Sequence, residues 1–430
     1  MCRNPGGKQA GRLQVCPPTS LPRPIRVTDE MLTRTEPGAD REQRGAELVE
    51  AAKRLAPTIA AAGARIDKDR EVPAEVIAAM HDARLFRMLI PRSIGGDEVE
   101  PATLFHVMET IAAADASVAW CLGQNSGVSM SAAYLDPNVA RELFGDPRTT
   151  VATGAPSANA KAIVTEGGYR VTGHWKFASG SRHSHWLGGH ATLCEPDGSP
   201  RLGANGKPLE QRTMYFPKSK AKITDTWQVI GLRGTGSDDY EVKDLFVPEA
   251  YSFTRESDAD RRETGPLYRF SIFNMFGMAF CAVALGIARS VLDDFILLAK
   301  QKTPHSQVML LANNTYIQIN IGHSQARLGA ARTYVLDYYA QLYEQASSGQ
   351  TISYAQRIAG RGVTCFAIQQ AREVVDFVYH AAGATAVFEQ NPYERRFRDL
   401  HTVTQQSQAH MTNFEALGQW MLGIEPVRKL

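Results

Sequence analysis

The spacing of apolar residues changes period twice along the chain, and this double change restricts the folds available to it. Over residues 43–144 apolar side chains recur every three or four residues, as in amphipathic helices. Over residues 151–253 the pattern becomes that of short strands separated by glycine- and proline-containing turns. After residue 266 the helical period returns and continues to about residue 422. The order predicts an α+β protein with a helical part, a β part and a second helical part.

We expect an N-terminal tail and three domains. The tail, residues 1–40, contains several prolines and no apolar periodicity, which predicts disorder. The expected domains are an α-helical domain at 41–150, a β-barrel domain at 151–265 and a four-helix bundle at 266–430. The long helices of the bundle are expected over residues 271–302, 306–347, 354–388 and 397–422. Pro57 falls inside the first apolar stripe, so the first helix could be kinked or divided.

Composition excludes several classes of protein. A hydrophobic fraction of 43% with 21% charged residues is typical of a soluble globular protein. The net charge of +2 gives no reason to expect nucleic acid or an anionic membrane as a partner. No apolar run reaches the ~18 residues that span a bilayer. The six cysteines show neither a Cys-x-x-Cys pair nor zinc-site spacing, so we expect reduced thiols, a cytoplasmic location and no metal.

One segment carries the main candidate for a ligand site. Residues 173–181 read Gly-His-Trp-Lys-Phe-Ala-Ser-Gly-Ser, with aromatic residues at alternating positions and a tip rich in hydroxyl groups. The pattern predicts a strand that ends beside a ligand, because hydroxyls can bond a planar cofactor while aromatic rings exclude water. No Gly-x-Gly-x-x-Gly fingerprint is present, so we do not expect the chain to bind a nicotinamide cofactor itself.

A second glycine-rich segment, residues 231–236, is not expected to bind phosphate. No Gly-Lys-Ser or Gly-Lys-Thr follows it, as a phosphate-binding loop would require. We expect instead a tight turn in which Arg233 and Thr235 anchor the barrel.

Five motifs, in this order, resemble those of the acyl-CoA dehydrogenase superfamily, and the resemblance covers residues 45–425. They are the loop at 90–96, the strand at 173–181, the run at 231–237 followed by 242–248, the segment at 284–289 and the segment at 395–399. The resemblance implies the fold of that family: an N-terminal helical domain, a middle β-barrel domain and a C-terminal four-helix bundle. It also implies a homotetramer, a dimer of dimers in which a neighbouring subunit touches each flavin.

The catalytic base of an acyl-CoA dehydrogenase is missing. Those enzymes need a carboxylate to remove an α-proton from a thioester, and the two family positions for it fall on Ser407 and Phe276. Residues 405–413 contain no acid, and Glu415 is the nearest one. The family motif that binds the FAD pyrophosphate is also absent near Lys302. Dehydrogenation of an acyl-CoA is therefore the weaker interpretation. Two alternatives are kept: an acyl-CoA dehydrogenase-like enzyme with a displaced base, and a catalytically inactive scaffold.

The chain is more similar to the two-component flavin-dependent monooxygenases of this fold. Their flavin strand reads Trp-x-Phe-x-Ser-Gly, as Trp175, Phe177, Ser179 and Gly180 do here. The resemblance implies a catalytic Ser179 that bonds flavin N5 and helps hold a C4a-hydroperoxide formed from reduced FMN or FAD and O2. It also implies a separate NAD(P)H:flavin reductase as partner. We expect Trp175 and Phe177 to shield the ring, with Ser181 as a further contact.

The resemblance also supplies the substrate-binding candidates. Phenol hydroxylases of this group carry histidines where this chain has Val128 and Gln406. We therefore expect a small aromatic, heteroaromatic or amine substrate rather than a simple phenol, with Gln406 as a catalytic group. The expected substrate-binding residues are Trp120, Gln124, Asn125 and Val128.

The remaining candidates lie in the C-terminal helices. Either His401 or Gln405 is expected to line the pocket, with His401 as a catalytic group. Arg269 or Arg289 is expected to reach a flavin phosphate. Gly383 is expected to contact the cofactor.

Overall fold

The structure is a computed structural model that describes residues 38–203, 205–209, 211–255, 257, 259–305 and 308–426. The chain divides into two units, residues 1–40 and 41–430. The second unit contains the elements analysed below. The predicted N-terminal tail lies outside the described residues, except for the first turn of helix at 38–40.

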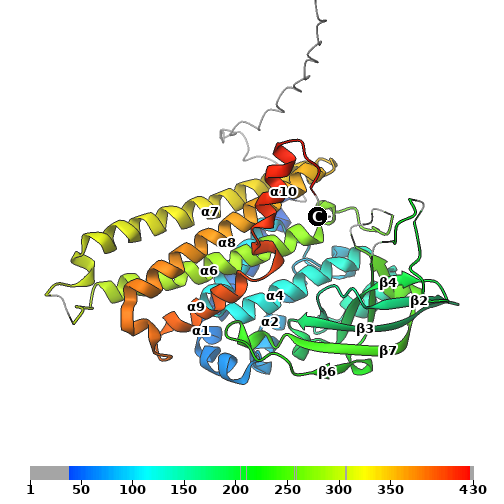
Figure 1. Cartoon of the computed structure of the whole chain (residues 1–430), viewed down its shortest axis with the longest axis horizontal. Coiled ribbons are helices and arrows are strands. Elements are labelled where there is room, and N and C mark those ends of the chain that lie inside the picture. The colour runs from blue at the N-terminus through cyan, green and yellow to red at the C-terminus, as the bar shows by residue number, and fades with distance from the viewer. Residues whose placement is uncertain are drawn as a thin grey trace, which may run out of the picture. The chain divides into compact units, whose positions relative to one another are not determined.

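The N-terminal helical segment begins with one long helix (Figure 1). Helix α1 continues through Pro57 as one helix, so it is not divided into two at this residue. Leu48, Ile59 and Ile66 of its apolar stripe are buried on both sides of Pro57, and that burial offsets the roughly 3 kcal/mol that an interior proline costs. The helices of this segment are α1 (Gly38–Asp69), α2 (Ala74–Asp82), α3 (Pro101–Ala114), α4 (Ala116–Ser129) and α5 (Pro137–Phe144).

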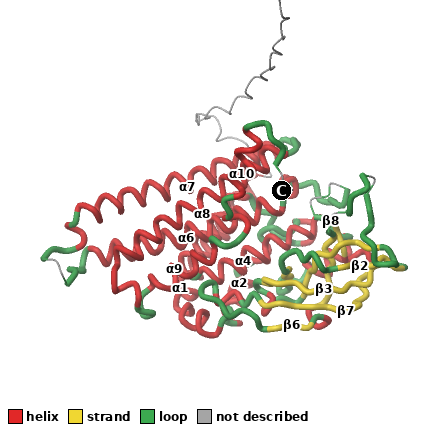
Figure 2. Tube along the Cα trace, viewed as in Figure 1, coloured by secondary structure: helices red, strands yellow, loops and turns green. Residues whose placement is uncertain are grey.

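The middle segment forms one mixed sheet, drawn in yellow in Figure 2. Along the sheet the strands follow the order β6-β7-β3-β2-β4-β5-β8, and β1 pairs with β4. Strand β4 pairs in parallel with β1 and β2, and the other pairs are antiparallel. The strands are β1 (Val151–Thr153), β2 (Lys161–Thr165), β3 (Gly168–Ala178), β4 (Trp186–Cys194), β5 (Arg212–Pro217), β6 (Lys222–Thr224), β7 (Asp238–Pro248) and β8 (Ser252–Thr254).

Strand β3 bends at its end and separates its two aromatic residues. The pairing with β7 shifts register between Trp175 and Ala178, and Phe177 has a left-handed φ of 62°. Trp175 is fully buried in the core of the sheet, where its indole N–H donates to the carbonyl of His190 at 2.9 Å. Phe177 is 58% exposed. The expectation that both rings shield one ligand is therefore not met by Trp175, which is a core residue.

The C-terminal segment returns to helices, which lie side by side in Figure 1. The expected fourth long helix over 397–422 is wrong as a single helix. The chain leaves helical geometry after Val403 and passes through a short 3-10 turn, Ser407–Ala409, which the Gln406 side chain caps. The helices are α6 (Ile272–Ala299), α7 (Thr315–Ser347), α8 (Tyr354–Ala382), α9 (Pro392–Val403) and α10 (Thr412–Met421).

Helix α6 is the central helix of the described structure. It packs against α3, α4, α7, α8 and α9. By length and composition α6 could cross a membrane, but 83% of its most apolar stretch is buried against the rest of the protein. A helix that is apolar on all sides is expected at the centre of a bundle.

The core of the sheet gives a first prediction. A Cβ on Gly189 would lie 2.4 Å from Cζ2 of Trp175, so Gly189→Ala would force the indole to move inside a packed core. We expect the free energy of unfolding to fall by about 1–3 kcal/mol, measured by denaturant titration. Gly329→Ala in α7 is the control, because its Cβ would meet nothing within 4 Å and alanine favours helix. A Gly189→Ala variant as stable as the wild type would contradict this packing.

Candidate functional site

The end of β3 carries Ser179 into a network of buried hydroxyl groups. Ser179 is 4% exposed, and its Oγ accepts a hydrogen bond from Nε1 of Trp120 at 3.1 Å. The same oxygen lies 2.7 Å from Oγ of Ser237, which lies 2.7 Å from Oγ1 of Thr235. The Thr235 hydroxyl donates to the carbonyl of Leu232 at 2.8 Å. Ser179 is thus fixed between α4 and the turn that precedes β7.

That turn is a short 3-10 helix, Arg233–Thr235, bounded by left-handed backbone on both sides. Leu232 has φ 50° and Gly236 has φ 48°. The Arg233 guanidinium donates to the carbonyl of Asp67 at 2.9 Å and ties the turn to α1. The backbone carbonyl of Thr235 accepts from the amide of Gly180 at 3.1 Å. Thr235 therefore holds this turn to the end of β3, whereas Arg233, predicted to anchor the barrel, ties it to α1.

Helix α9 holds the same turn through a buried carboxylate. Asp399 is 4% exposed and accepts from the amide of Leu232 at 2.6 Å. Burial, reinforced by the nearby carboxylate of Asp115, raises the pKa of Asp399 to about 7. The Leu232 amide, Arg395 and Arg398 favour the charged form and oppose this shift. The sequence predicts no such role for Asp399, because 167 positions separate it from Leu232.

Asn125 on α4 holds the turn that follows Ser179. Its Nδ2 donates to the carbonyl of Val151 at 2.8 Å, and its Oδ1 lies 3.0 Å from Nε2 of His183. Burial lowers the pKa of His183 to about 3, so this ring is neutral near pH 7. Gly180 has φ 77°, and a Cβ on it would lie 2.8 Å from Oδ1 of Asn125. Asn125, expected to bind substrate, is a structural clamp that requires glycine at position 180.

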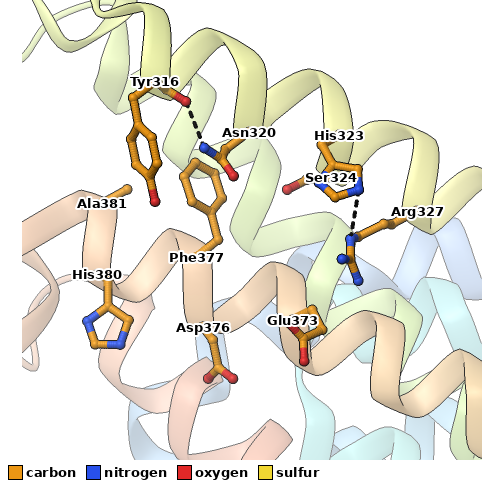
Figure 3. A pocket seen from close by; sticks show the side chains of 10 residues that line it. All are labelled: Tyr316, Asn320, His323, Ser324, Arg327, Glu373, Asp376, Phe377, His380 and Ala381. Carbon is orange, nitrogen blue, oxygen red and sulfur yellow. Dashed lines mark hydrogen bonds between the residues drawn. The ribbon is translucent and has the colours of Figure 1, made fainter.

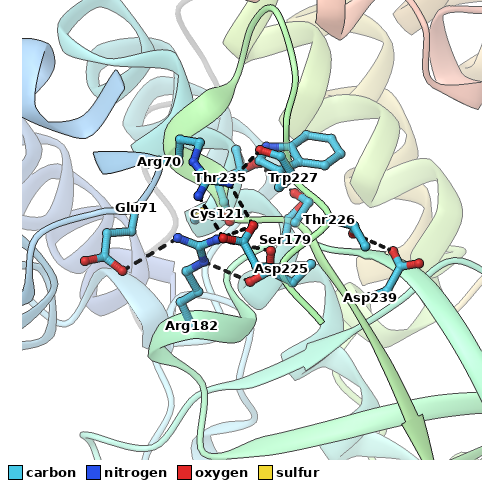
Figure 4. Close-up of polar contacts among 12 residues, drawn as sticks. Arg70, Glu71, Cys121, Ser179, Arg182, Asp225, Thr226, Trp227, Thr235 and Asp239 are labelled. Atoms are coloured by element: carbon cyan, nitrogen blue, oxygen red, sulfur yellow. Dashed lines mark hydrogen bonds and ion pairs between the residues drawn. The ribbon is translucent and has the colours of Figure 1, made fainter. Parts of the chain in front are cut away.

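An ion-pair network borders the Ser179 turn on its exposed side (Figure 4). Arg182 binds the carboxylate of Asp238 through two nitrogens, at 2.8 and 3.1 Å. It also lies 3.3 Å from Asp225, which Arg70 binds through two bonds of 2.7 Å each. The network joins the turn to the end of α1 and the start of β7.

A small cavity lies between α4, the sheet and α6. Its volume is about 20 Å³, room for about one water molecule. Its lining combines apolar residues (Val128, Phe253, Ile272, Phe276) with polar ones (Ser131, Thr153, His190, Thr213, Tyr215, Arg255). Burial lowers the pKa of His190 well below its usual range, so this ring is neutral as well. Val128, predicted to bind substrate, does line a cavity.

A stack of aromatic rings connects this cavity with Ser179. Phe276 lines the cavity and stacks on Phe280, with ring centres 5.8 Å apart. Phe280 stacks on Trp120 at 4.0 Å, and Trp120 bonds Ser179. Trp120, predicted to bind substrate, thus lies between the cavity and the hydroxyl network. Gln124 lies one turn further along α4 and is half-buried.

A larger hollow of about 440 Å³ lies between α7 and α8 (Figure 3). Its lining carries charges of both signs, including Arg327, Glu373 and Asp376. His401 joins this region, since its Nε2 lies 2.7 Å from Oδ1 of Asp376. Among the described residues no hydrogen bond or ion pair links His401 to Ser179. We therefore do not place the reaction in this hollow, although it is the larger one.

Gln406 is also not brought to Ser179. Its side-chain oxygen accepts from the amide of Gln408 at 2.8 Å and caps the turn after α9. Gln405, the alternative to His401, is exposed. Neither glutamine reaches Ser179 because the chain breaks between α9 and α10 and changes direction where a continuous helix was expected.

The cofactor candidates of the bundle lie apart from the Ser179 network. Arg269 donates to the carbonyl of Gly349 at 2.9 Å, and Arg289 pairs with Asp293 on its own helix. Gly383 ends α8 with φ 58°. Within the described part of one chain, none of these three residues bonds with Ser179. Ser237, Leu232 and Asp399 are the site residues that the sequence interpretation missed, although all three lie within the motifs at 231–237 and 395–399 that it singled out.

Comparisons with known proteins identify the family. Residues 43–136 match the family described as "Acyl-CoA dehydrogenase, N-terminal domain". Residues 278–411 match "Acyl-CoA dehydrogenase, C-terminal domain". The chain belongs to the acyl-CoA dehydrogenase superfamily, and the α+β fold predicted from the sequence is confirmed.

Within this superfamily the chain is a flavin-dependent monooxygenase. An indole-3-acetate monooxygenase of Pseudomonas putida is 27% identical over 365 residues, which cover 84% of this chain and 90% of the relative. The FADH(2)-dependent resorcinol hydroxylase, oxygenase component, of a Rhizobium strain is 27% identical over 380 residues, covering 84% and 90%. The structure of XiaF from Streptomyces, in complex with FADH2 and glycerol, has the same fold. Its TM-score is 0.84 at 23% identity, covering 92% of this chain and 100% of XiaF.

The raised pKa of Asp399 gives a second prediction. Between about pH 4 and pH 7 the folded protein keeps a proton that the unfolded chain has lost, so this carboxyl reduces stability as the pH rises through that window. Asp399→Asn keeps an acceptor for the Leu232 amide and removes the titration. We expect the stability of this variant relative to wild type to increase from pH 4 to pH 8 by on the order of a few kcal/mol.

Thermal unfolding at several pH values measures this difference. Asp293→Asn, which removes an exposed carboxylate paired with Arg289, is the matched control and should show a much smaller trend. An Asp399→Asn variant whose stability relative to wild type is independent of pH would contradict the shifted pKa.

Proposed function

We propose that this chain is the oxygenase component of a two-component system and uses reduced FMN or FAD and O2 to oxygenate a small organic substrate. The observation that carries the proposal is the hydroxyl of Ser179, which Trp120 holds at the end of a strand, two residues after the exposed Phe177. The resorcinol hydroxylase relative is described as an FADH(2)-dependent oxygenase component, and XiaF was solved with FADH2. A separate NAD(P)H:flavin reductase would supply the reduced flavin.

The residues around Ser179 fit a flavin ring. Phe177, two residues before Ser179, is exposed and meets Trp227 edge to face, with ring centres 6.1 Å apart, so an aromatic surface is available to a ligand. Oγ of Ser181 is buried without a hydrogen-bond partner within the described structure, and a polar ligand group would satisfy it. A bound reduced flavin supplies the electrons that activate O2. In this proposal Ser179 contacts flavin N5.

The surroundings of Ser179 limit the access of water and of acidic protons. The stack of Trp120, Phe280 and Phe276 fills the space between Ser179 and the small cavity. Burial keeps His183 and His190 neutral near pH 7, so neither imidazole brings an acidic proton to the site. A dry site with neutral neighbours protects reactive oxygen chemistry from hydrolysis and proton leakage.

We propose that the substrate, an aromatic or heteroaromatic compound or an amine, binds on the side of Val128 and Phe276. Aromatic and aliphatic walls with a few hydrogen-bonding groups are typical of sites for such molecules. The Pseudomonas relative is named for indole-3-acetate, a heteroaromatic compound. Because the cavity holds about one water molecule, the wall must move on binding, and the half-buried Phe276 is the side chain best placed to do so.

The same residues oppose dehydrogenation of an acyl-CoA. Phe276 stands at one expected position of the base, and it lines the cavity with an uncharged ring. Ser407, at the other position, is exposed and bonds Gln408. Glu415 is exposed on α10. A displaced carboxylate base is therefore not supported by the structure.

We also propose a cytoplasmic homotetramer. Helix α7 exposes Tyr316 and Ile319, and the end of α10 exposes Met421 and Leu422, all of them apolar surface that a second copy could cover. In such an assembly Gly383 could meet the flavin of a neighbouring copy. The four cysteines within the described residues are buried free thiols, which suits a reducing compartment.

Ser179→Ala tests the proposed site. The change removes the bond to flavin N5 and leaves the indole N–H of Trp120 without its acceptor. We expect affinity for reduced FMN to fall about three- to tenfold, and a larger share of the O2 consumed to be released as H2O2. Anaerobic titration measures the first effect, and peroxide assay after mixing with aerated buffer measures the second.

The matched control is Ser290→Ala, which removes a hydroxyl that bonds the carbonyl of Ile287 in α6. It should behave as the wild type. A wild-type chain that binds neither reduced FMN nor reduced FAD would refute the proposed function. Ser179→Ala with unchanged affinity and unchanged peroxide release would refute the role of Ser179 alone.

A further inference from the structure

We propose that Thr235 and Ser237 are positioning residues that fix the direction of the Ser179 hydroxyl proton and thereby make the site select reduced over oxidised flavin. The inference rests on the proposed function, because it takes Ser179 as the partner of flavin N5. It comes from a line of hydroxyl groups in which only one order of protons satisfies every contact (Figure 4 shows Ser179, Thr235 and Trp227).

The proton order follows from the end of the line. A carbonyl oxygen only accepts, so the 2.8 Å contact between Thr235 and Leu232 must use the single proton of the Thr235 hydroxyl. The 2.7 Å contact between Thr235 and Ser237 must then use the proton of Ser237. The 2.7 Å contact between Ser237 and Ser179 is left with the proton of Ser179. Each of the three short contacts thus takes one proton, and all of them point away from Ser179.

Ser179 is consequently an acceptor toward any ligand. A hydroxyl has one proton and two acceptor lone pairs. The proton is engaged by Ser237, and one lone pair accepts from the indole N–H of Trp120 at 3.1 Å. The group that remains is one lone pair, which suits a ligand that carries an N–H or O–H donor.

The two redox states of flavin differ at the atom concerned. N5 of oxidised flavin bears a lone pair and only accepts, whereas N5 of reduced flavin carries a hydrogen and donates. An acceptor at Ser179 therefore bonds reduced flavin and faces oxidised flavin lone pair to lone pair. The unfavourable contact of Ser179 with oxidised flavin discriminates as strongly as its favourable bond to reduced flavin, because an unpaired buried polar group is costly.

The far end of the line is held rigidly, so the order cannot easily reverse. The carbonyl of Leu232 also accepts from Nε1 of Trp227 at 3.0 Å. The amide of the same residue donates to the buried carboxylate of Asp399 at 2.6 Å. Thr235 and Ser237 are each 2% exposed, so water does not compete for their hydroxyls.

The test compares the affinities of the full-length protein for reduced and oxidised FMN under anaerobic conditions. The wild type should bind reduced FMN more tightly. In Ser237→Ala the Ser179 hydroxyl is free to donate to N5 of oxidised flavin. The dissociation constant for oxidised FMN divided by that for reduced FMN should therefore fall about three- to tenfold. The midpoint potential of the bound flavin should shift to a more negative value for the same reason.

Thr235→Val is a second variant of similar shape. Without Thr235 as acceptor, the Ser237 proton can turn toward Ser179, and the ratio should fall in the same direction. Cys121→Ala is the matched control: Cys121 is buried and its thiol lies 3.7 Å from the carbonyl of Thr235, but it is outside the line of hydroxyls. Its ratio should equal that of the wild type.

The outcomes separate the inference from the function on which it rests. A wild type that binds both redox states equally, or variants that weaken both states by the same factor, would overturn the inference and leave the flavin site intact. Equal weakening of both redox states in the variants would show that Thr235 and Ser237 only support the fold. A wild type that binds neither state would overturn both the inference and the proposed function.

Discussion

The hydrogen bond between the amide of Leu232 and the carboxylate of Asp399 joins the sheet to the helical bundle at the point on which the site depends. Leu232 is in left-handed geometry, and its carbonyl receives the last proton of the hydroxyl line that begins at Ser179. A bond of 2.6 Å to a buried carboxylate therefore fixes a backbone turn, the turn fixes two hydroxyls, and these fix the third. The cost is a buried carboxyl whose pKa is raised to about 7.

The same arrangement explains why the site combines rigidity with neutrality. Trp120 ties Ser179 to α4, and Asn125 ties the following turn to the same helix. Both lie on a helix that is buried over most of its length, so their positions are set by packing rather than by exposed loops. The imidazole of His183, which Asn125 contacts, is neutral because desolvation lowers its pKa. The ion pairs of Arg182 with Asp238 and Asp225 lie at this turn as well.

Much of the fold followed from patterns within short stretches of sequence. The change of period placed the helices and strands, and most of the expected strands and helices occur where the pattern indicated. Two differences from the pattern have local causes. Pro57 does not divide α1, because burial of the apolar residues on both sides of it compensates for its cost. The chain after Val403 was expected to continue as a helix, but the Gln406 side chain caps a 3-10 turn and ends the regular structure.

The sequence by itself determined the fold class, the superfamily and the candidate Ser179, because periodicity and short motifs are local properties. Only the tertiary structure decided what surrounds Ser179. It turned Trp175 into the core and Phe177 outward through one bend in β3, and it kept His401 with Asp376 rather than with Ser179. It brought Asp399 to Leu232 across 167 positions. Such contacts depend on how distant segments pack, and no local pattern of residues encodes that packing.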